Sequence, residues 1–175
     1  MLSLTSLTYS QVPTSWTELN SPHRCQVTFS YPSDWTVSNE KSRDRFDTSD
    51  RSIVSVRSSS EMPIFSVLDC AQWTGDPSDI VFSSYVHDRM DKIIQGKLFA
   101  EFLGNDQGLV SNSSKTAHVT TIKENDIGTE YYWVLHNGIR YTFTYSDLAD
   151  RFDSPESKQI RDRILDTLEF QYLQD

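Results

Sequence analysis

The alternation of apolar and polar residues marks the first regular element of the chain. In CQVTFSY, residues 25–31, every odd position is apolar and every even position is polar. Period-two alternation predicts a half-buried strand. Pro32 has no N–H for a strand ladder, and Ser33 and Asp34 favour turns. We therefore expect a tight corner here, followed by a second short strand that begins at Trp35.

Further strands are predicted by alternating or continuously apolar segments. These segments are residues 52–58, 63–73, 115–123, 129–137 and 139–146. The pattern assigns residues 38–52 to a solvated loop and residues 104–114 to a polar turn region. Residues 98–104 fit either a short strand or the extension of a helix.

The dipeptide Asn137-Gly138 predicts a two-residue type I′ turn between the last two strands, with both residues at positive φ. Such a turn fixes the register of the hairpin. The expected cross-strand pairs are His136 with Ile139, Val134 with Tyr141, and Tyr132 with Phe143. The face formed by these pairs is aromatic and aliphatic, so we expect it to lie against a helix.

The other face of this hairpin is mixed. Tyr131, Trp133 and Leu135 fall opposite Thr144, Thr142 and Arg140. We expect this face to be a partly open surface where a partner protein docks, centred on Trp133 and including Tyr131, Leu135 and Arg140. The aromatic residues of both hairpin faces, Tyr131, Trp133, Tyr141, Phe143 and Tyr145, also suit a ligand groove. Ordinary cross-strand packing is the simpler interpretation of the whole set.

Two helices are predicted by apolar stripes at helical spacing. The first stripe is Phe82, Val86, Met90 and Ile93, with Asp76 as its expected cap. The second helix begins at the sequence Ser-Pro-Glu of residues 154–156, and its stripe is Ile160, Ile164, Leu165 and Leu168. We expect Trp35 to be buried against this second stripe, near Ile164 or Leu168.

Composition and charge exclude some classes of function. The chain has 175 residues and a formal net charge of −9, which disfavours binding to nucleic acid. No apolar run is long enough to span a membrane. The N-terminus lacks the features of a secretory signal. We therefore expect a cytoplasmic protein if Met1 is the native start, and an extracytoplasmic one if a signal peptide has been removed.

Candidate chemistry is sparse. No phosphate-binding glycine loop, nucleophile elbow or zinc-spaced cysteine pair is present, so we expect neither an enzyme nor a cofactor. Asp147, Asp150 and Asp153 offer carboxylates to a hard cation. Their simpler role is to solvate a loop and face the positive end of the following helix. For Cys25 and Cys70 we favour buried free thiols over a disulfide.

Three segments carry a resemblance to a known family. They are FSYPSDW (29–35), FSSYVHDRMDKI (82–93), and YYWVLHNGIRYTFTYS (131–146) followed by a terminal helix that ends in DTLEF (166–170). Over residues 24–172 the chain resembles the PsbP-like superfamily, which also includes the Ran-binding Mog protein, the DcrB lipoproteins and the Eag chaperones.

The resemblance implies an α+β fold, an α/β/α sandwich with a mostly antiparallel central sheet and two main helices. Residues 1–22 would form an extended or flexible arm, and residues 23–175 a single domain. It also implies a non-enzymatic protein-binding or assembly module, either a chaperone-like adaptor or an accessory subunit of a photosynthetic or membrane complex. The alternative is a small-molecule or metal-binding domain that uses the aromatic hairpin face and nearby acids.

Overall fold

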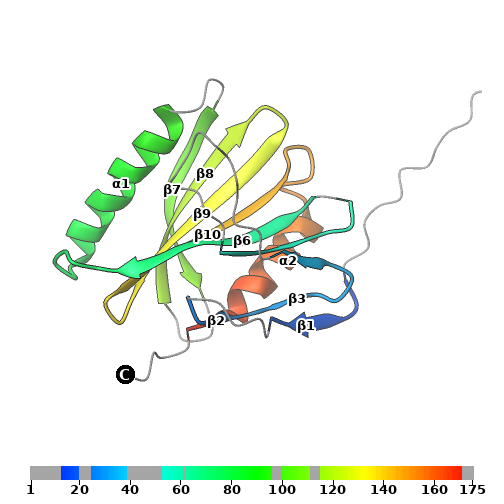
Figure 1. Ribbon diagram of the computed structural model, residues 1–175. Helices are drawn as coiled ribbons and strands as arrows, with labels where there is room; N and C mark the ends of the chain where they lie inside the picture. The colour runs from blue at the N-terminus through cyan, green and yellow to red at the C-terminus, as the bar shows by residue number, and fades with distance from the viewer. Residues whose placement is uncertain are drawn as a thin grey trace, which may run out of the picture.

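The computed structural model describes residues 13–19, 25–38, 53–60, 62–95, 100–110 and 115–170, with the backbone alone for residues 100–110 and 115–117. Within these ranges a central antiparallel sheet has a helix against each of its faces (Figure 1). This arrangement confirms the expected α+β class. No described helix is long and apolar enough to cross a membrane.

The central sheet has seven strands in the order β4-β5-β6-β10-β9-β8-β7, and every neighbouring pair is antiparallel. Its strands are β4 (Thr36–Ser38), β5 (Val54–Arg57), β6 (Ile64–Gln72), β7 (Ala100–Val110), β8 (Lys115–Glu124), β9 (Ile127–His136) and β10 (Ile139–Leu148). The strands predicted at residues 52–58, 63–73, 115–123, 129–137 and 139–146 are confirmed. The prediction of a turn at residues 104–114 is wrong for residues 104–110, because β7 continues to Val110 and pairs with β8, and residues 111–114 lie outside the described residues.

Two short strand pairs involve the N-terminal part of the chain. In the first, β1 (Trp16–Glu18) pairs with β3 (Ser30–Pro32), and in the second, β2 (Val27–Thr28) pairs with β11 (Glu169–Phe170). The corner after β3 is closed by Trp35 N, which donates to the Pro32 carbonyl at 3.0 Å. Trp35 is only 7% exposed and belongs to the same hydrophobic cluster as Ile164 and Leu168, so its predicted burial is confirmed.

The predicted hairpin turn is present. Asn137 and Gly138 have φ values of 49° and 73°. The register pairs His136 with Ile139, and continues through Val134 with Tyr141 and Tyr132 with Phe143, as the turn requires. Because side chains alternate across a strand, this register fixes which residues of β9 and β10 face each helix.

Helix α2 (Pro155–Asp166) covers one face of the hairpin. Ser154 caps it, since its hydroxyl accepts a hydrogen bond from Ser157 N at 3.1 Å. The predicted stripe is buried, and it shares one core with the hairpin face that was expected to lie against a helix. This core includes Tyr132, Val134, Tyr141, Phe143, Ile160, Ile164, Leu165 and Leu168.

Helix α1 (Asp79–Gln95) buries the predicted stripe Phe82, Val86, Met90 and Ile93. The expected cap at Asp76 is wrong, because the helix begins at Asp79 and Ser78 holds the capping position, where its carbonyl accepts from Phe82 N. Asp76 instead accepts from Ser78 N through its Oδ1. The four stripe residues share a second core with Ile122, Tyr131 and Trp133. The expectation of an open face around Trp133 is therefore wrong, since that face is closed by α1.

Cys25 and Cys70 form a disulfide, with Cα atoms 5.6 Å apart. The preference for free thiols is therefore wrong. The bond ties Cys25, two residues before β2, to β6 across a sequence separation of 45. Local sequence patterns do not reveal this pairing, because it depends on a long-range contact.

We expect loss of this disulfide to lower the free energy of unfolding by ~2–4 kcal/mol, because the bond restricts the unfolded chain. The measurement is urea unfolding of the native protein and of the Cys25→Ala/Cys70→Ala variant, each with and without reductant. Reductant should lower the urea midpoint of the native protein and leave that of the variant unchanged. An equal midpoint for the two proteins, without reductant, would contradict a stabilising bond.

Candidate functional site

The residues predicted to form a docking surface have structural partners instead. Trp133 is 2% exposed and Tyr131 is also buried, while Leu135 is half-buried against the same core. Arg140 lies 3.1 Å from Asp69 on β6, donates to the Tyr85 hydroxyl and stacks 5.3 Å from the centre of the Tyr85 ring. It therefore links β10 both to the neighbouring strand and to α1.

An aromatic cluster fills the space between the N-terminal half of α1 and the sheet. Its contacts are mostly edge-to-face, as between Trp73 and Phe82 at 5.4 Å and between Tyr85 and Trp133 at 6.4 Å. His118 contacts the Phe82 ring and lies 3.0 Å from Asp79 at the start of α1. The rings pack against one another, so the cluster holds α1 in place.

The three aspartates predicted as metal-ligand candidates do not form a shared site, because each has a different environment. Asp147 is 3% exposed and accepts from the Arg151 guanidinium at 2.8 Å and the Ser157 hydroxyl at 3.0 Å. Asp150 is exposed, and Asp153 lies 3.5 Å from Lys158. No group of three potential metal ligands occurs among the described side chains. The simpler expectation also fails for Asp147, because it is buried in an ion pair rather than solvated.

Asp147 belongs to a buried polar network that joins α2 to the sheet. The Ser157 and Tyr145 hydroxyls lie 2.8 Å apart, and Arg151 also donates to the Met62 carbonyl at 3.2 Å. Burial raises the pKa of Tyr145 well above its ordinary value, so the hydroxyl stays protonated. Each residue of this network has at least one hydrogen-bond partner, which lowers the penalty of burying it, while Arg151 Nε is buried without one.

A second buried ion pair lies beside this network. Arg161 is 8% exposed, and its Nη1 lies 3.1 Å from Glu130 Oε1. Its guanidinium also stacks over the rings of Tyr145 and Phe152, at 5.7 and 5.5 Å. The Tyr132 hydroxyl donates to Glu130, and burial, followed by the charge of Glu130, raises the Tyr132 pKa well above its ordinary value. Sequence reasoning missed Arg161, since an arginine on a helix usually faces water.

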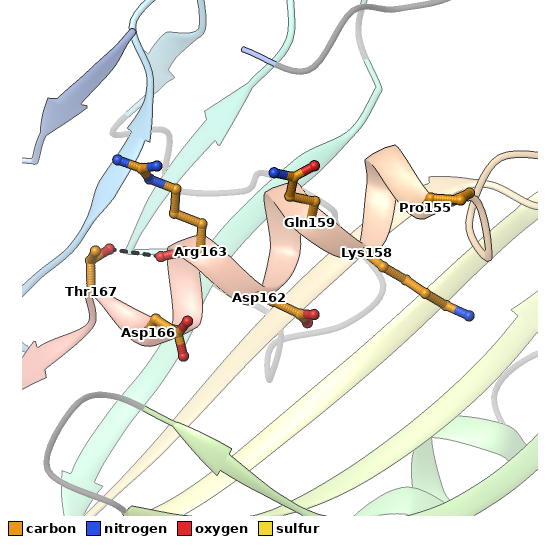
Figure 2. Close-up of a pocket in the computed structure, with 7 residues that line it drawn as sticks. All are labelled: Pro155, Lys158, Gln159, Asp162, Arg163, Asp166 and Thr167. Carbon is orange, nitrogen blue, oxygen red and sulfur yellow. Dashed lines mark hydrogen bonds between the residues drawn. The ribbon is translucent and has the colours of Figure 1, made fainter. Parts of the chain in front are cut away.

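The outward face of α2 carries a solvent-exposed polar surface. A depression of about 590 Å³ is lined by Pro155, Lys158, Gln159, Asp162, Arg163, Asp166 and Thr167 (Figure 2). We call this the α2 outer surface. All its residues are exposed except Thr167, which is half-buried. The sequence contains a signal for this surface, because its residues occupy the helix positions that the apolar stripe leaves exposed.

The polar side chains of the α2 outer surface lie in two rows, one with three charged residues and one with a single charged residue. Lys158, Asp162 and Asp166 follow one another at intervals of four residues, so they lie along one side of the helix. Gln159 and Arg163 form the other row, and Figure 2 shows them pointing away from the two aspartates. The Arg163 guanidinium stacks 4.6 Å from the centre of the Trp16 ring on β1. This stacking brings an aromatic residue to the border of the surface.

The C-terminal end of the α2 outer surface is fixed to β3. The Thr167 hydroxyl donates to the Arg163 carbonyl at 3.0 Å (Figure 2) and accepts from Ser30 N at 2.9 Å. Leu168, the next residue, is fully buried. The surface is therefore presented on a helix whose ends are both anchored, by Ser154 at one end and Thr167 at the other.

No protein-family model matches the sequence, and no match to a curated protein was found. Comparison with solved structures does give matches. Cyanobacterial PsbP (CyanoP) from Synechocystis sp. PCC 6803 is 17% identical with a TM-score of 0.64, covering 90% of this chain and 93% of that one. LpqN of Mycobacterium tuberculosis is 12% identical with a TM-score of 0.49, covering 90% and 92%. The likeness to CyanoP confirms the expected architecture: this chain has a PsbP-like fold.

Proposed function

We propose that this domain is a non-catalytic protein-binding module that recognises its partner through the α2 outer surface. The observation that carries the proposal is the lining of that surface, which is polar apart from Pro155 and is charged at Lys158, Asp162, Arg163 and Asp166. Small-molecule sites are typically enclosed and mostly apolar. An open surface with both signs of charge is better suited to a complementary protein surface.

The charged residues of the α2 outer surface indicate which side chains a partner would carry at the interface. Asp162 and Asp166 are complementary to basic side chains of a partner. Lys158, at the N-terminal end of the same row and 3.5 Å from Asp153, is complementary to an acidic one. Trp16 and Arg163 at the border belong to the residue types that most often dominate binding energy at interfaces. Because both ends of α2 are anchored, little conformational entropy is lost there on binding.

The alternative function, a small-molecule or metal site on the aromatic hairpin face, has less support. Trp133 and Tyr131 are buried beneath α1, and Asp147 is neutralised by Arg151. The PsbP-like fold supports a role in assembly, as an adaptor or as an accessory subunit of a larger complex, by analogy of fold alone.

We further infer that the protein works in an oxidising compartment, because disulfides are rare in cytosolic proteins. Alkylation of intact native cells with a membrane-permeant maleimide, before lysis, tests this. Both cysteines should stay unlabelled until the protein is denatured and reduced. Labelling of Cys25 and Cys70 in denaturant without reductant would contradict the inference.

The binding proposal predicts crosslinking at the α2 outer surface. With a photo-crosslinking amino acid at Gln159, irradiation of the native host should give one dominant crosslinked protein. The same amino acid at Lys123, an exposed residue of β8, serves as the control. Comparable crosslinking at both positions, or none at Gln159, would count against the proposal.

Charge reversal should then abolish this crosslink. The variant Asp162→Lys/Asp166→Lys removes the acidic row, and it should change the unfolding free energy by no more than ~0.5 kcal/mol because both residues are exposed. The matched control, Asp91→Lys/Asp126→Lys, makes the same change of charge at exposed positions on α1 and in the β8–β9 turn. Retention of the crosslink in the first variant would show that the surface is not used.

A further inference from the structure

Among the described strands, β7 is the last of the sheet and is paired along one edge only. On one side β7 (Ala100–Val110) pairs with β8, and no described strand pairs with its other side (Figure 1). In an antiparallel ladder, alternate residues direct their N–H and C=O groups away from the paired neighbour. An 11-residue strand is roughly 36 Å long, so β7 carries a row of backbone donors and acceptors of that length.

The sequence of β7 lacks proline and basic residues, two of the features that protect a sheet edge. AEFLGNDQGLV contains no proline, lysine or arginine, all of which discourage pairing with another chain. The register shift between Phe102 and Gly104 is the one irregularity in its pairing with β8, and residues 104–110 continue without another. The opposite edge strand, β4, has three residues, and a short edge is itself a form of protection.

Glycine occurs twice in β7, once at the register shift and once four residues beyond it. In a strand interior glycine often marks a bulge, as at Gly104, or the close approach of another backbone. Because Gly104 and Gly108 are an even number of residues apart, they lie on the same face of the strand.

Charge indicates which occupant fits this edge. The acidic residues Glu101 and Asp106 are the only charged residues of β7, and the whole chain carries a net charge of −9. Two copies of the chain would repel each other. We propose that β7 is a strand-addition site, which pairs along residues 104–110 with an extended segment of a partner protein rich in lysine or arginine. The inference rests on the proposed protein-binding function and uses a surface distinct from that of α2.

Binding of synthetic peptides tests the proposal. The probe is a fluorescent peptide of about eight residues that alternates lysine with threonine and valine, a typical strand length and composition. One control has N-methyl groups on alternate amides, which remove the donors on one edge but keep the charge. The other control replaces each lysine with glutamate. Fluorescence anisotropy measures affinity, and amide hydrogen exchange by NMR locates the binding.

We expect the cationic peptide to bind and to protect alternate amides of residues 104–110. Loss of the ladder hydrogen bonds should weaken the N-methylated peptide by about tenfold or more, and the glutamate peptide should bind weakest. Asp106→Lys should weaken the cationic peptide by about tenfold, since an edge lysine opposes pairing and repels the probe. Asp150→Lys, the same change of charge at an exposed loop residue, should leave its affinity unchanged.

Three results would overturn the proposal. Equal binding of the N-methylated peptide would show attraction by charge alone. Protection of the outer β7 amides without peptide, in a monomer, would show that the chain itself covers the edge. The same protection in a dimer would make a second copy the occupant. Crosslinking at Gln159 is independent of all three, so the α2 proposal and this one can fail separately.

Discussion

The Asn137-Gly138 turn is the constraint on which most of the structure depends. Both residues take positive φ, which most residues avoid, and the two-residue connection leaves one register for β9 and β10. A slip of one residue in either strand would move each of its side chains to the other face. The turn therefore decides that Tyr132 and Val134 face α2, while Tyr131 and Trp133 face α1.

The assignment of β9 and β10 side chains to two faces explains why the structure has two hydrophobic cores. Each helix covers one face of the hairpin, and Asp147 and Arg161 centre two polar networks between α2 and the sheet. The two proposed recognition surfaces, the outer side of α2 and the edge of β7 that no described strand covers, both lie outside the cores. Asp162 and Asp166 line the first, and the sequence of the second contains Glu101 and Asp106.

Local pattern predicted the parts of the fold that local physics controls. The hairpin register follows from the turn, and the stripes of both helices follow from spacing, so these could be read from the sequence. The features that were missed depend on long-range contacts. The disulfide of Cys25 needs β6 beside it, and the burial of Trp133 needs α1 across the sheet. The polar composition of β7 favoured a turn, but pairing with β8 holds it as a strand.

Helix α1 closes the Trp133 face, and both proposed recognition surfaces therefore lie outside the two cores. Fluorine NMR of protein labelled with 5-fluorotryptophan tests this closure, with the four tryptophan signals assigned by single Trp→Phe substitutions. The fluorine shift of a buried ring does not respond to replacement of H2O by D2O. We expect no solvent shift for Trp133. A shift as large as that of free 5-fluorotryptophan would show that the face is open and would contradict the account.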